Sequence, residues 1–138
     1  MAGQHPDLDL APVVDAYGYL KIVLNPDGTV TRGLDDPTTP AVPDPDHPFA
    51  VRTKAVPLNP THNTWARIYV PPSSPTPDQK LPLIVYYHGG GFVLMSPSSA
   101  INHNFCSLMA ASLSAVFVSP GYCLAPEHRL PVAYDDAV

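Results

Sequence analysis

Positive charge and long apolar runs are both scarce in this sequence. Lys and Arg together number 7 among 138 residues, against 12 Asp and Glu, and the formal net charge is −5. Proteins that bind nucleic acid through its backbone carry a basic surface, so we expect no nucleic-acid partner. The longest apolar run covers residues 83–87, whereas a membrane-spanning helix needs about 20 apolar residues. We therefore expect no membrane partner either.

Cysteine is scarce too, and its placement argues against two further classes of protein. The two cysteines, Cys106 and Cys123, form neither a Cys-x-x-Cys pair nor a Cys/His spacing typical of a metal site. This pattern favours a reduced, intracellular chain over a disulfide scaffold. The first 17 residues carry three aspartates and lack the basic and apolar segments of a secretory signal. The sequence predicts a cytoplasmic protein without a metal.

Proline, by contrast, is abundant, at 19 of 138 residues, when the average share is about 5%. The chain is nevertheless 45% hydrophobic and only 14% charged, and disordered chains show the opposite balance. Five prolines fall within residues 35–48, which predicts an extended, solvated connector, and residues 71–80 form a second loop. Proline therefore marks the connections of one modest domain rather than disorder.

The first half of the chain has the pattern of two strand pairs. Residues 19–24 and 29–32 flank the turn residues Asn25-Pro-Asp-Gly28 and predict a hairpin. Residues 51–58 alternate apolar and polar side chains, and residues 65–70 follow after a short gap. We expect these two strands to be antiparallel neighbours.

The second half has the pattern of a βαβ unit. Residues 83–87 are apolar without alternation, which is typical of a strand covered on both faces of a parallel sheet. Phe105, Leu108, Met109 and Leu113 then recur at helical spacing and predict the buried face of a helix. Residues 115–119 form another buried strand, and a helix begins near Tyr134. The sequence thus predicts an α/β fold.

The stretch His88-Gly89-Gly90-Gly91-Phe92 is the strongest indication of chemistry. Three glycines after a buried strand permit positive φ and leave backbone N–H groups unshielded, as an oxyanion hole requires. A strand before the loop and a helix after it match the HGGG-type context. A dinucleotide fingerprint fails because position 94 is Leu, and no P-loop pattern exists. A turn without chemistry stays an alternative, and His88 is expected to brace the loop rather than transfer protons.

A second polar stretch surrounds the start of the last helix. Glu127, His128 and Arg129 are best interpreted as a structural ion-pair cluster. Asp135 and Asp136 do not converge on one atom, because adjacent residues of a helix point about 100° apart. We expect them to stabilise the helix N-terminus through the macrodipole.

Taken together, the segments 81–92, 125–131 and 134–136 resemble the plant carboxylesterase group of the hormone-sensitive-lipase-type α/β-hydrolases. The resemblance implies the N-terminal half of an α/β-hydrolase fold, with a mostly parallel central sheet flanked by helices, truncated before the nucleophile-elbow strand. It implies a serine esterase with a Ser-His-Asp triad, a small-molecule ester substrate and no cofactor. His88, Gly89, Gly90 and Gly91 would form the oxyanion-hole loop, with the N–H groups of Gly90 and Gly91 as its donors.

The resemblance also implies a division of the chain. Residues 1–50 would form an N-terminal cap segment and the Pro-rich connector. Residues 51–138 would form the first, incomplete part of the catalytic domain. The oligomeric state is not indicated by the sequence.

The sequence departs from the family pattern in two places. It contains no Gly-x-Ser-x-Gly, so all three triad residues are expected beyond Val138 and this fragment is expected to be inactive. Without the elbow strand, residues 83–87 would form an open, uncharged sheet edge. Gly121 and Cys123 also replace an acid and an arginine of the family pattern, and Pro120 with Gly121 would weaken a strand end. The alternative to an esterase is a non-hydrolytic relative, such as a gibberellin-type hormone receptor or a dehydratase or cyclase.

Overall fold

The computed structural model describes residues 15–41, 51–72 and 80–137. The chain divides into two compact units, one up to Leu34 and one from Asp35 onward. Across these described ranges, none of the helices has the length and apolar character that a membrane span requires.

The first unit is a helical turn followed by a hairpin. Helix α1 (Ala16–Tyr19) begins where the Asp15 carboxylate accepts hydrogen bonds from two backbone N–H groups of the first turn, each at 3.1 Å. Strands β1 (Ile22–Leu24) and β2 (Val30–Arg32) pair antiparallel, which confirms the predicted hairpin. Tyr19, expected in the first strand, belongs instead to the capped helical turn.

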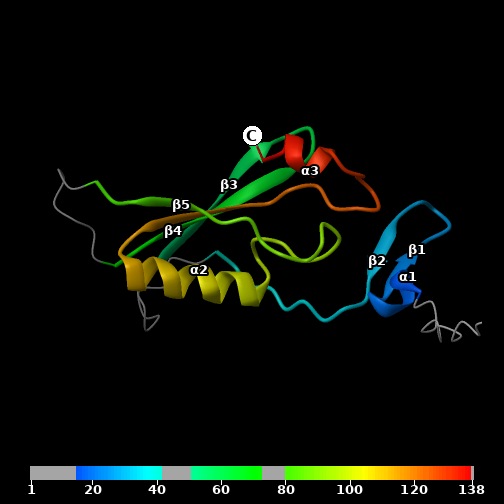
Figure 1. The fold of residues 1–138 in the computed structure, drawn as a ribbon, viewed down its shortest axis with the longest axis horizontal. Coiled ribbons are helices and arrows are strands. Elements are labelled where there is room, and N and C mark those ends of the chain that lie inside the picture. The colour runs from blue at the N-terminus through cyan, green and yellow to red at the C-terminus, as the bar shows by residue number, and fades with distance from the viewer. Residues whose placement is uncertain (1–14, 42–50, 73–79, 138) are drawn as a thin grey trace, which may run out of the picture. The chain divides into compact units, whose positions relative to one another are not determined.

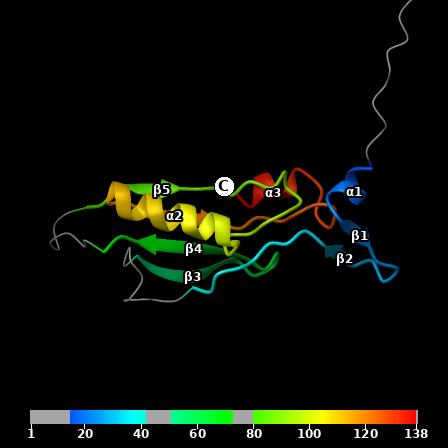
Figure 2. The same ribbon diagram turned by 90° about the horizontal axis from the view of Figure 1, so that it is seen from below.

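The second unit is built on a four-stranded mixed sheet. Its strands are β3 (Arg52–Asn59), β4 (Thr64–Val70), β5 (Leu83–Val85) and β6 (Val116–Pro120), in the spatial order β3-β4-β6-β5. The β3–β4 and β4–β6 pairs are antiparallel, and β5 and β6 are parallel. Figure 2 shows β3 and β5 at opposite margins of this sheet. The predicted antiparallel pair and the predicted βαβ unit are both confirmed.

Helix α2 (Ala100–Leu113) connects β5 to β6 and packs on one face of the sheet, over β4 and β6 (Figure 1). The core between helix and sheet consists of buried apolar residues of small and medium size, with two aromatic rings. These are Val51, Tyr69, Cys106, Ala110, Ala115 and Phe117.

The predicted buried face of α2 is wrong for three of its four residues. Phe105, Leu108 and Leu113 are 43%, 46% and 51% exposed, only Met109 packs against the core, and a different face of the helix is buried. That face carries Asn102 and His103 as well as Cys106 and Ala110. Small side chains let the helix approach the sheet closely, and hydrogen bonds satisfy the buried polar ones: the Asn102 amide donates to Ser96 O at 3.0 Å.

The expectation that residues 83–87 are covered on both faces is also wrong for the described structure. Leu83 and Val85 are 65% and 50% exposed, whereas the alternate residues Ile84 and Tyr86 pack against the core, so only one face of this segment is covered. Strand β5 is also the last strand at this margin of the described sheet. The expected open edge is therefore present. Strand β6, by contrast, has a neighbour on each side.

The first part of the predicted connector is mostly exposed to solvent, as expected, but hydrogen bonds also hold it against the second unit's loops and sheet. Thr38 forms a β-bridge with Ser99, and the Ser99 hydroxyl donates to the Asp36 carboxylate at 2.7 Å. The Arg67 guanidinium donates to Thr39 O at 2.6 Å. Residues 42–50 of the connector and 73–79 of the second predicted loop lie outside the described residues.

Candidate active-site loop and a neighbouring polar cluster

The three glycines follow β5 and precede α2, as the sequence predicts. Gly90 and Gly91 have φ of +114° and +62°, in the region that favours glycine. A Cβ at position 90 would lie 2.2 Å from the Leu94 carbonyl oxygen, so a side chain there cannot be accommodated without moving the backbone. Glycine at position 90 is therefore required by the shape of this turn.

The glycine turn leaves backbone N–H donors without hydrogen-bond partners in the described part of the chain. The Gly90 carbonyl accepts from the N–H groups of Val93 and Leu94, each at 3.1 Å, which closes the turn on its own acceptor. For the N–H groups of Gly89, Gly90 and Gly91, the described part of the chain provides no hydrogen-bond acceptor. Unengaged N–H groups of fixed orientation are what an anion-stabilising site needs.

His88 braces the loop, in agreement with its expected structural role. It is 4% exposed, and its ring Nδ1 lies 2.8 Å from Gly89 O. The Tyr122 ring stacks on it with centroids 4.4 Å apart, and the Tyr122 hydroxyl donates to His88 O at 2.6 Å. Tyr122 follows β6, so this contact ties together the ends of two adjacent parallel strands. The sequence did not predict this contact, because Tyr122 lies far from the loop along the chain.

The protonation of this pair follows from its burial. Burial lowers the pKa of the His88 ring, although the hydrogen bond to Gly89 and the nearby Asp36 carboxylate act in the opposite sense. The ring is therefore neutral at pH 7, with Nδ1–H donated to the Gly89 carbonyl. Burial raises the pKa of the Tyr122 hydroxyl, so this group remains a donor.

A cavity of about 330 Å³ lies beside the loop, and its walls are mainly glycine and aromatic residues. The lining residues are Tyr87, His88, Gly89, Gly91, Phe92, Tyr122, Ala133, Tyr134 and Ala137. Helix α3 (Val132–Asp135) forms one wall, and the Tyr87 hydroxyl donates to Ala137 O at 2.8 Å. Such a cavity suits the apolar part of a small ligand.

The predicted helix start near Tyr134 is confirmed by α3, but the role expected for Asp136 is wrong. Asp136 stands at the C-terminal cap of α3, and its side chain is 1% exposed. Its Oδ1 lies 2.7 Å from His62 Nδ1, and its Oδ2 accepts from the Cys123 N–H at 2.9 Å. Asp136 thus holds three segments together instead of acting on a helix dipole. Asp135 does lie in the first turn of α3.

Glu127, His128 and Arg129 are all exposed. The His128 ring lies 5.9 Å from the His62 ring, which places it beside the Asp136 contact. Their pairing as an ion-pair cluster stays a prediction.

The expected weakening of the strand end at Gly121 is not observed. Strand β6 runs through Pro120, which pairs with Ala66, and the Gly121 N–H donates to Trp65 O at 2.8 Å. A Cβ at position 121 would lie 3.1 Å from that same carbonyl oxygen and 3.3 Å from Pro97 Cδ. The small residue thus permits close packing at this end of the sheet.

Comparison with known proteins agrees with this geometry. The family model described as the α/β hydrolase fold matches residues 84–138, which contain the glycine loop, α2 and β6. An esterase from the archaeon Pyrobaculum calidifontis superimposes with a TM-score of 0.54 at 39% sequence identity, covering 62% of this chain and 26% of that one. The chain therefore carries part of an α/β-hydrolase fold.

Proteins of similar sequence indicate which group of α/β hydrolases the chain belongs to. Carboxylesterase 20 of Arabidopsis thaliana is 50% identical over 133 residues, covering 93% of this chain and 41% of that protein. The 3-O-acetylpapaveroxine carboxylesterase of Papaver somniferum is 43% identical over 130 residues, covering 91% of this chain and 38% of that protein. The chain belongs to the plant carboxylesterase group of the α/β hydrolases, and it spans about two fifths of the length of these relatives.

Proposed function

We propose that this chain supplies the oxyanion-hole loop of a carboxylic-ester hydrolase that acts on small acylated substrates. The observation that carries the proposal is the turn at Gly90 and Gly91, whose N–H groups have no acceptor in the described part of the chain and which borders an apolar cavity. The relatives named as carboxylesterases support the same chemistry.

The proposed role follows from the charge that develops in ester cleavage. Attack of a nucleophile on the ester carbonyl turns its oxygen into an oxyanion, and each fixed N–H donor stabilises that charge by about 3–4 kcal/mol. Gly90 and Gly91 would provide these donors. His88 would take no proton, because its ring is buried, neutral and committed to the Gly89 carbonyl. It fixes the loop instead, together with Tyr122.

The nucleophile would come from another part of the protein. No Gly-x-Ser-x-Gly occurs in the 138 residues, and the relatives extend well beyond the part that this chain matches. We therefore expect the chain alone to hydrolyse no ester. A purified, monodisperse 138-residue chain that cleaves p-nitrophenyl acetate, in a manner blocked by a serine-directed phosphonate, would contradict this.

A chimera tests the oxyanion-hole role directly. In carboxylesterase 20, the segment that this chain matches is replaced by the chain itself, and hydrolysis of p-nitrophenyl acetate is compared with that of the unaltered enzyme. We expect an active chimera. Gly90→Ala should lower its kcat about 100-fold or more with a smaller change in KM, because the new Cβ forces the donors out of position.

Gly28→Ala serves as the control. Gly28 also has a positive φ, +84°, and an added Cβ there would have no atom within 4 Å, so the substitution carries a similar backbone cost outside the loop. It should keep kcat within a few-fold of the parent chimera. Equal losses for the two variants would show that the Gly90 effect is one of folding.

A further inference from the structure

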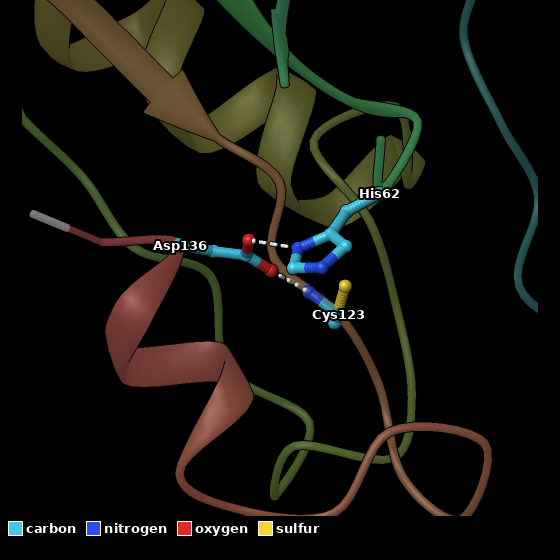
Figure 3. A group of neighbouring side chains, drawn as sticks. All are labelled: His62, Cys123 and Asp136. Atoms are coloured by element: carbon cyan, nitrogen blue, oxygen red, sulfur yellow. Dashed lines mark hydrogen bonds and ion pairs between the residues drawn. The ribbon is translucent and has the colours of Figure 1, made fainter. Parts of the chain in front are cut away.

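Three side chains that commonly bind metals converge where separate segments of the second unit meet (Figure 3). His62 comes from the connection between β3 and β4, Cys123 from the segment after β6, and Asp136 from the end of α3. A ring nitrogen, the Sγ atom and a carboxylate oxygen all lie within 4.8 Å of one another. The fold alone creates this cluster, because its members stand far apart in the sequence.

We propose that His62, Cys123 and Asp136 bind a divalent transition-metal ion of the zinc type. Zinc bonds of about 2.0–2.3 Å in tetrahedral geometry place neighbouring ligand atoms about 3.5 Å apart. The 2.7 Å contact between His62 Nδ1 and Asp136 Oδ1 must therefore open by about 1 Å. The three ligand atoms already lie within 4.8 Å of one another, so side-chain movements on the order of 1 Å bring them to the separations that these bond lengths require.

The negative charge of Asp136 also favours a bound cation. The Asp136 side chain is 1% exposed, and its hydrogen-bond partners in the described part of the chain belong to His62 and Cys123. Neither partner carries a permanent positive charge, but their hydrogen bonds favour the ionised carboxylate despite its burial, so it is available as an anionic ligand. A divalent cation supplies a positive charge at the point where the carboxylate already lies.

The solvent exposure of the cluster and the elements of its ligand atoms indicate which cation it would bind. The His62 side chain is 32% exposed, so an ion has a route to the cluster from solvent. The exposed His128 ring lies 5.9 Å from that of His62, between ring centroids. One nitrogen, one sulfur and one oxygen ligand select zinc or cobalt over calcium or magnesium, which prefer oxygen alone.

The same three residue types also occur in nucleophilic Cys-His-Asp sites, but the environment of the thiol argues against that use. Cys123 is 5% exposed. Reactive nucleophilic cysteines are partly exposed, whereas buried cysteines are inert toward substrates. A bound cation, in contrast, takes the thiolate as its ligand and releases the proton to solvent.

Titration of the tag-free 138-residue chain with Co²⁺ tests the proposal, because a Co²⁺–thiolate bond gives a near-ultraviolet charge-transfer absorption. We expect saturation at one ion per chain and displacement by Zn²⁺. Cys123→Ser should abolish the absorption, and His62→Gln should weaken binding at least about tenfold. Cys106→Ser, at the other buried cysteine in the core, should keep the absorption.

A second measurement separates binding from misfolding. Zn²⁺ should raise the urea midpoint of the parent chain and of Cys106→Ser, but not that of His62→Gln, with folding verified by far-ultraviolet circular dichroism. Absence of the charge-transfer absorption in the folded parent chain would overturn the proposal. So would an absorption that survives Cys123→Ser, or a Zn²⁺ effect of equal size in His62→Gln.

Discussion

The Tyr122 hydroxyl shows how much of the loop geometry depends on single residues. It donates to His88 O at 2.6 Å while its ring covers the His88 ring, so one residue after β6 fixes the start of the glycine turn after β5. The shape of this loop also requires glycine at position 90. The conformation of the loop therefore depends on contacts from outside it.

Removing that hydroxyl should destabilise the chain. We expect Tyr122→Phe to lower the free energy of unfolding by about 1–2 kcal/mol, because a buried carbonyl loses its donor while the ring stacking persists. Urea denaturation measures the change. Tyr134→Phe is the matched control, since Tyr134 also lines the cavity but is 55% exposed. Equal effects of the two variants would argue against the bracing role.

The neutral His88 ring predicts a dependence of stability on pH. Because burial lowers its folded pKa below the unfolded value of about 6.5, the unfolded chain binds a proton first as the pH falls. The free energy of unfolding should therefore decrease from about pH 6.5 down to the folded pKa and then level off. His88→Gln should remove this slope in urea titrations between about pH 7 and 5. An unchanged slope would assign the effect to another group.

The sequence predicts the backbone conformation of single residues where that conformation depends only on neighbouring residues in the chain. The glycine run predicts positive φ, and Gly90 and Gly91 adopt it, because only glycine enters that region freely. The partners Tyr122 and Asp136 could not be predicted, since their contacts join segments that are distant in sequence. Spacing rules for metal sites fail for the same reason with His62 and Cys123.

At the level of elements, α2 shows where pattern reading fails. Its existence follows from helical spacing, but its buried face does not, because a periodicity argument counts Asn102 and His103 as solvent-facing. The structure buries both. The Tyr86 hydroxyl donates to the Asn102 side chain at 3.3 Å, and His103 lies 3.2 Å from the Arg67 guanidinium. Hydrogen bonds thus replace hydrophobicity in deciding the face.

Substitutions on the two faces of α2 should differ accordingly. Ala110→Leu should lower the free energy of unfolding by about 1–3 kcal/mol, because Ala110 is fully buried against Tyr69 and Phe117. Leu108→Gln should change it by less than about 0.5 kcal/mol, because that side chain is 46% exposed. Urea midpoints of the purified variants provide the comparison. The opposite ranking would restore the face that periodicity predicts.

At the level of the whole molecule, the margin of the described sheet at β5 is an open edge. This open edge matches what the family resemblance predicts. The apolar face of α2 adds Phe105 and Leu108 to the exposed surface of this unit. An apolar strand edge together with an exposed apolar helix face is prone to pairing with other chains.

A charge on that edge should reduce self-association. We expect Val85→Lys to lower the aggregated fraction of the 138-residue chain in size-exclusion chromatography with light scattering, since Val85 is 50% exposed in β5. Leu34→Lys adds the same charge outside the described strands. If both variants improve solubility equally, net charge rather than the β5 edge is responsible.

The parallel pairing of β5 with β6 has a consequence for the order of folding. Strand β3 finds its neighbour β4 across a short turn, whereas Leu83 of β5 pairs with Val116, after the whole of α2. Closing such a long loop is slower and entropically costlier than closing a hairpin. We expect the β3–β4 hairpin to form early and the glycine loop, which follows β5, to reach its final shape only when β6 and Tyr122 have docked.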